Sequence, residues 1–252
     1  MSNIPIALQL YSLRDDCAKD LLGTLGDVAK MGYEAVEFAG YFGHDAKTIR
    51  QRLDEVGLKC AGVHTSLGTL QPDELKNTAE FVHTLGSPFL VVPYVSPEQF
   101  GGRDGALKLG DVLSRIAEDA AKFGSRVGYH NHDWEFKTLP DGSIPMDLIF
   151  QNADSSVVTQ LDTGNAQDGG GNAIPLLAKY KNRAATVHLK PWTQDFSRYY
   201  VGEDDTPWPE VFQALKGGST EFYIVEQERY PEPNTPKQCV ERCLKNLKGM
   251  GI

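Results

Sequence analysis

Short apolar segments alternate with longer segments of helical periodicity along the whole chain, without a low-complexity linker between them. Short apolar runs bounded by turn residues are typical of buried strands, whereas apolar residues that repeat every three or four positions indicate amphipathic helices. The apolar runs predict strands at residues 6–11, 35–38, 60–64, 89–93, 127–130, 157–162, 186–190 and 223–226. The helical patterns lie at residues 21–31, 48–56, 74–85, 107–123, 146–151, 174–180, 208–215 and 237–247.

Eight strands that each precede a helix predict a parallel sheet, and eight such pairs close a barrel more naturally than they form an open sheet. The length of 252 residues agrees with this architecture, for which about 250 residues are typical. The sequence therefore predicts an α/β protein with a single domain, residues 1–252, folded as a (β/α)₈ TIM barrel. In such barrels the loops that follow the strands build the active site.

Composition excludes some classes of function. The formal net charge of −9 and the pI near 5.2 disfavour a nucleic-acid partner, because phosphate binding needs a basic surface. The mean hydropathy of −0.36 predicts no membrane span. The first ten residues lack the basic and apolar regions of a secretory signal, which predicts a cytoplasmic protein. The four cysteines form no CxxC pair, so we predict no metal or redox role for them.

Side chains of metal-ligand type end or follow the last four predicted strands. They are His130, Asp162, His188 and Glu226. Roughly 30 residues, the length of one strand-plus-helix unit, separate each from the next, so we expect all four at one rim of the barrel. Two imidazoles and two carboxylates suit one divalent ion, such as Mn²⁺, Mg²⁺, Co²⁺, Zn²⁺ or Fe²⁺. A lone strand-end histidine is usually an ordinary core residue, but several buried charges need an ion or a substrate to offset their desolvation.

Three further polar residues stand two positions beyond proposed ligands: His132, Lys190 and Glu228. Because strand side chains alternate between two faces, each shares a side with the ligand before it. A divalent ion in this pocket would polarise a sugar carbonyl and stabilise the enediolate formed when a neighbouring proton is removed. We predict acid–base work for His132, Lys190 and Glu226. The first prediction is an isomerase or epimerase of a small sugar or keto-sugar, which returns the proton to carbon. The alternative is a lyase or dehydratase of a 3-keto-glycoside or keto-inositol, which expels a β-hydroxyl group.

Other residues near the predicted rim are candidates for contact with substrate. They are Gln9, Glu37, His64, Trp192 and Glu228. Structural alternatives exist for three of them, since Glu37 can pair with Arg14, His64 can cap a loop and Trp192 can anchor one.

Two conspicuous segments are predicted to carry no chemistry. Residues 169–171 are three glycines without the Gly-Lys-Ser/Thr continuation of a phosphate loop, and we expect a flexible rim loop there. The acidic residues 203–205 lie between glycine and proline, and we expect a solvated turn.

Five segments carry a resemblance to a known family. They are LQLYSLRD at 8–15, GYEAVEFAG at 32–40, YHNHDWEF at 129–136, LDTGN at 161–165 and VHLK at 187–190. Their order and spacing resemble the sugar phosphate isomerase/epimerase, or xylose-isomerase-like TIM barrel, superfamily. The resemblance implies one divalent ion, a small carbohydrate substrate, and ligands at Asp162, His188 and Glu226. It leaves open whether the protein is a monomer or a homo-oligomer.

The fifth strand departs from the ketose 3-epimerases of that superfamily. These enzymes carry a glutamate there that binds the ion and moves a proton, whereas this chain has His130 followed by His132. Lys190 also replaces a polar contact of the epimerases. The His-rich fifth strand is similar to the inosose dehydratase and keto-glycoside lyase branches, so β-elimination has equal weight with isomerisation. A non-catalytic sugar-binding barrel is a further alternative, and DNA repair of the endonuclease IV type is disfavoured by the acidity.

Overall fold

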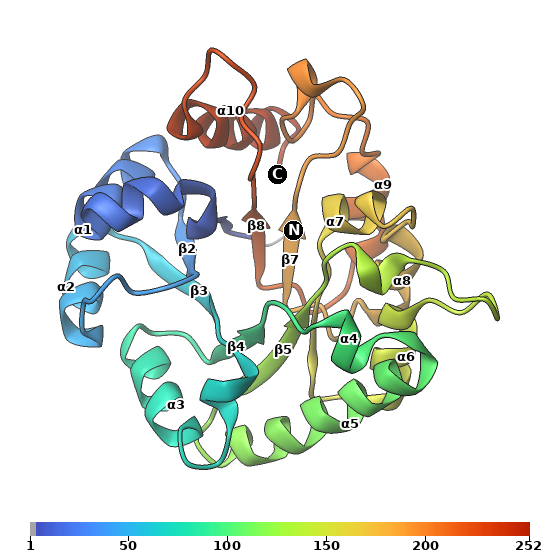
Figure 1. The fold of residues 1–252 in the computed structure, drawn as a ribbon. Coiled ribbons are helices and arrows are strands. Elements are labelled where there is room, and N and C mark those ends of the chain that lie inside the picture. The colour runs from blue at the N-terminus through green and yellow to red at the C-terminus, as the bar shows by residue number, and fades with distance from the viewer. Residues whose placement is uncertain (1–3) are drawn as a thin grey trace.

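The structure, a computed structural model, describes residues 4–252 and consists of a ring of eight parallel strands surrounded by helices (Figure 1). The strands are β1 Ile6–Gln9, β2 Ala35–Phe38, β3 Lys59–His64, β4 Phe89–Val92, β5 Arg126–His130, β6 Val158–Gln160, β7 Thr186–Leu189 and β8 Phe222–Val225. Their order in the sheet is β6-β5-β4-β3-β2-β1-β8-β7. An isolated parallel bridge between Asp162 and His188 joins the segment after β6 to β7 and closes the ring. The (β/α)₈ barrel predicted from the sequence is therefore confirmed.

Helices connect successive strands on the outside of the ring. They are α1 Arg14–Met31, α2 Ala46–Val56, α3 Leu75–Thr84, α4 Pro97–Phe100, α5 Gly102–Ala121, α6 Pro145–Asn152, α7 Thr163–Asp168, α8 Ile174–Tyr180, α9 Trp208–Leu215 and α10 Pro236–Gly249. Short 3-10 turns lie at Leu10–Leu13, Leu67–Leu70, Trp134–Phe136 and Phe196–Arg198. Gly32 and Gly57 end α1 and α2 with φ angles of 95° and 76°, a left-handed conformation that a Cβ atom would strain.

The interior of the barrel is apolar towards one end and polar towards the other. Two small apolar clusters, separate from the main core beneath the helices, line the interior: Ala7, Ala35, Ala61 and Ile224, and Phe89, Val91, Val158 and Ala185. Residues two positions apart on a strand face the same way. The buried polar residues Gln9, Glu37, Gln160 and Glu226 therefore follow apolar ones into the same interior, two residues later along their strands. This polar layer at the strand ends positions the candidate site.

Most element boundaries agree with the predicted ones, and two differences lie near the rim formed by the strand ends. Helix α1 is interrupted at Asp20, whose φ of −159° and ψ of 88° are not helical, so its longer part begins at the expected Leu21. A short helical stretch from Arg14 precedes the interruption, and Asp15 and Asp16 occupy its first turn. Acidic residues there interact favourably with the positive end of the helix dipole. Helix α7 lies where no helix was predicted, because the Asp162 side chain accepts a hydrogen bond from Asn165 N at 2.6 Å and begins the helix.

Gly169 and Gly171 pack closely on the segment after β5, a contact that the expectation of a flexible rim loop did not include, whereas Gly170 between them is exposed. A Cβ atom on Gly169 would lie 2.2 Å from the backbone oxygen of Asp133. One on Gly171 would lie 2.7 Å from the ring of Phe136. Glycine is needed here because the segment after β6 packs directly on the one after β5.

The acidic residues 203–205 likewise have structural roles that their composition does not suggest. Glu203 Oε1 accepts a hydrogen bond from Arg242 Nε on α10 at 2.6 Å. Asp204 is half-buried and accepts one from Trp208 Nε1 at 2.6 Å. The segment is a turn, as expected, with Asp205 exposed, and it also connects the segment after β7 to α9 and α10.

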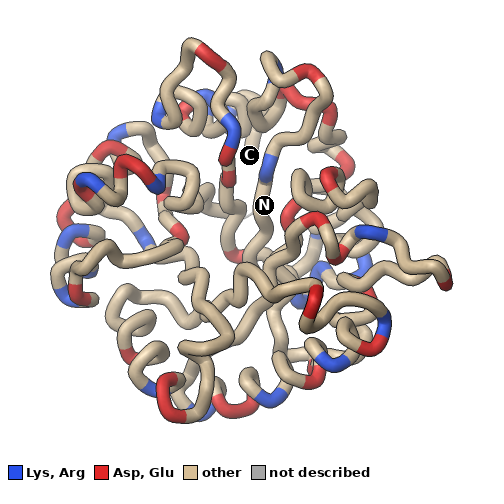
Figure 2. The backbone as a smooth tube through the Cα atoms, viewed as in Figure 1, with Lys and Arg blue, Asp and Glu red and all other residues tan. Residues whose placement is uncertain are grey.

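Charged residues of both signs are mixed over the outer helices (Figure 2). Within residues 4–252, no helix has the length and apolarity needed to cross a membrane. Residues 1–3, where the segment considered for a targeting signal begins, lie outside the described residues.

Candidate metal centre

The four predicted ligand residues converge at the polar end of the barrel. His130 ends β5, Asp162 precedes α7, His188 lies in β7, and Glu226 directly follows β8. One ligand atom from each lies within 4.8 Å of those of the others, and all four residues are buried. His188 Nδ1 is 2.9 Å from Glu226 Oε2 and 3.7 Å from Asp162 Oδ2, while His130 Nε2 is 3.9 Å from the same glutamate oxygen. The expected meeting of these side chains is thus observed, and their binding of a metal stays a prediction.

The donor set fits a divalent cation. Asp162 Oδ2 and His130 Nδ1 are buried without a hydrogen-bond partner among the described residues. An unsatisfied buried polar atom costs about 1–3 kcal/mol, and ligation of an ion by the cluster would offset the cost at the carboxylate. Oxygen and imidazole nitrogen donors together suit Mn²⁺, Co²⁺ or Zn²⁺.

The electrostatics of the cluster favour an added positive charge. Burial raises the pKa of Asp162. Burial alone would also raise the pKa of Glu226, but the neighbouring Lys190 and His188 outweigh it and lower that pKa well below its usual value. Two carboxylates within one buried site repel each other unless cations lie between them.

Lys190 and Glu228 form an ion pair beside the cluster. Lys190 Nζ contacts Glu228 Oε2, and the lysine is only 3% exposed. Burial alone would lower the pKa of Lys190, but the carboxylates of Glu226, Asp162 and Glu228 outweigh it and raise the pKa. The lysine is therefore an ammonium group, suited to hold negative charge on a substrate oxygen rather than to bind a metal.

His132 packs beside His130, the proposed ligand at the end of β5. Its ring centroid is 5.3 Å from that of His130 and 5.3 Å from that of Tyr94, whose ring packs edge-on. Nδ1 of His132 has no hydrogen-bond partner among residues 4–252. Burial lowers the pKa of this histidine, which leaves the neutral ring able to accept a proton.

A cavity of about 280 Å³ opens onto the cluster. Its lining comprises Tyr11, Ala39, His64, Pro93, Tyr94, His130, His132, Glu226 and Glu228. The two tyrosines, 43% and 51% exposed, are wall residues that the sequence analysis did not single out. Both directly follow or end predicted strands on the rim, which is the signal that would have found them.

Three predicted substrate contacts lie elsewhere than on this wall. Gln9 and Glu37 are fully buried beneath the cluster, where Gln9 Nε2 donates to Glu37 Oε2 at 2.6 Å. Glu37 does not pair with Arg14, which instead donates to Tyr230 Oη at 3.2 Å. Trp192 Nε1 donates to an exposed aspartate in the rim. This placement favours supporting roles for all three, and contact with a substrate stays untested.

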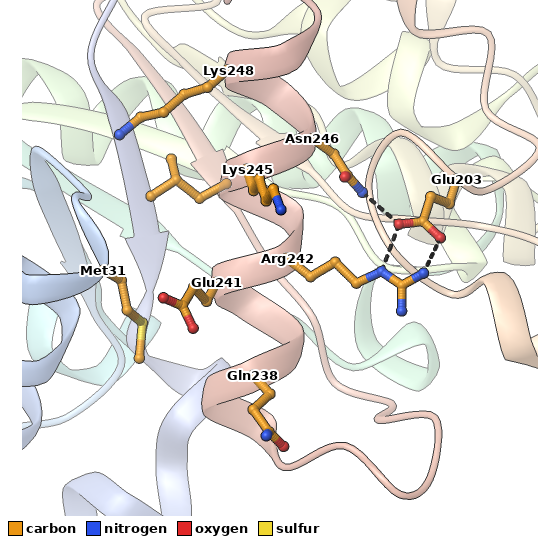
Figure 3. A pocket seen from close by; sticks show the side chains of 9 residues that line it. Met31, Glu203, Gln238, Glu241, Arg242, Lys245, Asn246 and Lys248 are labelled. Atoms are coloured by element: carbon orange, nitrogen blue, oxygen red, sulfur yellow. Dashed lines mark hydrogen bonds and ion pairs between the residues drawn. The ribbon is translucent and has the colours of Figure 1, made fainter.

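A larger cavity of about 710 Å³ runs along α10, away from the cluster (Figure 3). The figure shows Arg242 directed at Glu203, and Asn246 Nδ2 donates to the same carboxylate at 2.9 Å. Glu203 and Arg242 satisfy each other there, and within residues 4–252 no residue of this lining belongs to a group of converging metal-ligand residues. The smaller cavity is therefore the candidate site.

Comparison with known proteins identifies the family. Residues 25–247 match the family described as "Xylose isomerase-like TIM barrel", and the chain belongs to it. The resemblance read from the sequence motifs is thereby confirmed.

Individual relatives are more distant. An inosose dehydratase of Geobacillus kaustophilus is 29% identical over 193 residues, which span 68% of this chain and 62% of that protein, less than two thirds of its length. A sugar phosphate isomerase/epimerase of Parabacteroides distasonis has a similar structure, with a TM-score of 0.84, 24% identity and coverage of 98% and 94% of the two chains. The IolI protein, described with a bound zinc atom, gives a TM-score of 0.74 at 17% identity over 97% of each chain. At these identities the two structures show the fold alone.

Proposed function

We propose that the protein is a divalent-metal-dependent enzyme that removes a proton next to the carbonyl of a small keto-sugar or keto-polyol. The observation that carries this proposal is the buried cluster of His130, Asp162, His188 and Glu226 at the floor of a sugar-sized cavity. The side chains of this cluster are compatible with one Mn²⁺, Mg²⁺, Co²⁺ or Zn²⁺ ion. The zinc atom described for the IolI protein, which has a similar fold, supports the presence of a metal.

When bound, such an ion would polarise the substrate carbonyl and stabilise negative charge that develops on its oxygen. His132 then acts as the base, because its unpartnered Nδ1 lies in the ring that lines the cavity. The ammonium group of Lys190, which follows β7, contacts Glu228, which follows β8, and contributes positive charge to the site. Burial of these groups strengthens each interaction by excluding water.

Elimination is the outcome that we favour. In that reaction the C–H bond next to the carbonyl breaks, its proton goes to His132, its electrons form a C=C bond, and the β C–O bond breaks. The leaving hydroxyl group takes a proton from Lys190 or a group linked to it and departs as water. The name of the Geobacillus kaustophilus relative supports this choice, as does the histidine where ketose 3-epimerases carry a glutamate.

Isomerisation or epimerisation is the second candidate, and a specific feature favours it. His132 on one side and the Lys190–Glu228 pair on the other give two separate acid–base groups at one cavity. Two such groups can remove a proton from one carbon and return one to another carbon or to the opposite face.

The test uses metal-loaded protein in deuterated water with a panel of ketohexoses, keto-inositols and 3-keto-glycosides. A product that has lost water supports elimination, and solvent deuterium on carbon in a product of otherwise unchanged composition supports isomerisation or epimerisation. Glu226→Ala should abolish either reaction, whereas Asp168→Ala, a change at an exposed rim aspartate, should not. Absence of exchange and of product across the panel would favour a non-catalytic sugar-binding barrel and overturn the proposal.

A further inference from the structure

A second buried carboxylate lies directly beneath the candidate metal centre. Glu37, in the middle of β2, has no exposed surface, and both of its oxygens have partners. Oε2 accepts from Gln9 Nε2 at 2.6 Å and lies 2.7 Å from His188 Nε2, while Oε1 accepts from Gln160 Nε2 at 2.7 Å. His64 Nε2 approaches the same Oε2 to 3.1 Å. Glu37, on β2, thus contacts residues of four other strands, β1, β3, β6 and β7, across the inside of the barrel.

The chain makes room for this carboxylate. A Cβ atom on Gly62, in β3, would lie 3.0 Å from Glu37 Oε1. The pairing of β2 with β3 also shifts register between Val36 and Glu37. A glycine beside a register shift lets the glutamate side chain enter the barrel where neighbouring residues are apolar.

Burying a carboxylate here has a large desolvation cost that simple packing would avoid. Positions two residues earlier in the same interior carry Ala7, Ala35 and Ile224. An apolar side chain at position 37 would extend that cluster without a charge. We therefore expect the charge of Glu37 to act on one of its partners. His188 is the partner that also belongs to the metal cluster.

The two nitrogens of His188 face different groups. Nε2 is directed at Glu37, and Nδ1 is directed at Glu226 and Asp162. A neutral imidazole carries one N–H, and the nitrogen that lacks it has the lone pair for a metal. With the proton on Nε2 and donated to Glu37, the Nδ1 lone pair faces the cluster. With the proton on Nδ1, the ring would donate to Glu226 and could not ligate there.

We propose that Glu37 is the positioning residue of the metal centre: it holds the Nε2 proton of His188 and thereby commits Nδ1 to the ion, while Gln9, Gln160 and His64 fix the carboxylate. The inference rests on the proposed metal site and assigns Glu37 no contact with substrate, consistent with its absence from the cavity wall. Histidine ligands of metals commonly depend on such a hydrogen bond from the second nitrogen.

Glu37→Gln tests the inference with nearly constant shape. A glutamine has one acceptor oxygen and no charge. At the place of Oε2 that oxygen would face Gln9 and His188 but leave an N–H group opposite Gln160, and at the place of Oε1 it would no longer face His188. Either arrangement removes the negative charge that fixes the Nε2 proton of His188. We expect the affinity for Co²⁺ or Zn²⁺, measured by competition with a chromophoric chelator, to fall about 10- to 100-fold. The visible absorption spectrum of the Co²⁺ form should also change, because the ring of His188 is no longer fixed.

Tyr33→Phe is the matched control for a purely structural effect. It removes a buried hydrogen bond, from Tyr33 Oη to Val240 O at 2.7 Å, on the outer side of the barrel. Its metal affinity and Co²⁺ spectrum should equal those of the wild type even though it loses stability. Metal affinity of Glu37→Gln within twofold of the wild type would overturn the inference.

A measurement on the wild type guards against a variant that fails to fold. In Zn²⁺-loaded protein with ¹⁵N-labelled histidine, long-range ¹H–¹⁵N spectra should show His188 protonated at Nε2 and metal-bound at Nδ1. The opposite assignment would overturn the role of Glu37 while leaving the metal centre intact. If the wild type binds none of these metals, the proposed function fails and the inference fails with it. Metal binding with the opposite assignment is the outcome in which the inference alone fails, so the two failures are distinguishable.

Discussion

The two halves of the barrel rim contribute different chemistry to one cavity. The segments at the ends of β5 to β8 supply the four clustered metal-ligand residues and the acid–base candidates beside them. Those of β1 to β3 supply Gln9, Glu37 and His64, which bond to one another, to His188 and to Gln160 of β6. The difference teaches that the ligand cluster comes from one half, whereas the layer that supports it comes mainly from the other, so substitutions in the cluster and in the supporting layer should fail in different ways.

The largest expected effect comes from removing a ligand in the second half. Asp162→Ala deletes the carboxylate whose Oδ2 has no partner among the described residues. We expect metal affinity to fall by more than about 100-fold, beyond the range typical of supporting groups, and turnover to fall with it. Elemental analysis of protein purified without chelator gives the readout. Asp168→Ala, at the other end of α7, is the control, and equal metal content in all three proteins would contradict a centre at this cluster.

His132→Ala should separate catalysis from metal binding within the second half. The ring lines the cavity but lies outside the four-residue cluster. Loss of a general base typically costs 10²- to 10⁴-fold in rate, so we expect kcat to fall by about that factor at unchanged metal content. His83→Ala, on α3 and remote from the cavity, should retain full turnover. A large loss of metal in His132→Ala would instead make this residue the strand-five ligand.

Two buried glutamates, one from each half, should respond to pH in opposite ways. At Glu37 burial would raise the pKa, but His64 and His188 outweigh it and lower it. At Glu135, beside Tyr129 and the backbone N of His132, burial prevails and raises the pKa from 4.5 to about 7.

The raised pKa of Glu135 gives a signed prediction for stability. Between pH 4.5 and 7 the folded protein holds a proton that the unfolded chain has released, so this group makes the free energy of unfolding fall as pH rises through that window. The full change is on the order of 3 kcal/mol. Glu135→Gln should lack this component and be more stable than the wild type at pH 8, as measured by urea unfolding. A wild-type and variant pair with parallel pH profiles would show that the carboxyl group ionises normally.

The smallest expected effect comes from a member of the supporting layer that does not touch a ligand. Gln160→Leu removes the donor to Glu37 Oε1 but leaves the contact of Glu37 with His188. We expect destabilisation of about 1–3 kcal/mol, the cost of an unsatisfied buried acceptor, and only a severalfold loss of metal affinity. A loss as large as that of Asp162→Ala would show that the ligand cluster and the supporting layer do not have separate roles.

The sequence predicts the second half of the site well and the first half poorly. His130, Asp162, His188 and Glu226 each stand at the end of a recognisable apolar run, and parallel strands bring such ends together by rule. Their convergence therefore follows from local pattern and repeat length. The reaction does not follow, since the same groups serve elimination and isomerisation.

The supporting layer depends on features that no local pattern carries. Glu37 reaches His188 across the barrel, over a sequence separation of 151 residues, at a place where β2 and β3 shift register beside a glycine. Gln160 was not singled out because a glutamine within a short apolar strand has no distinctive signal. Helix α7 was missed because its glycine and asparagine favour turns, and the cap by Asp162 overrides that preference.

The bridge between Asp162 and His188 lies at the seam where the sheet order begins and ends. Beside it, His188 N donates to Leu161 O at 2.9 Å. Two of the four proposed ligands therefore form the closing contact of the cylinder itself. A cation bound by both would hold β6 and β7 together where the ring closes, so metal binding should stabilise the closed barrel as well as the site.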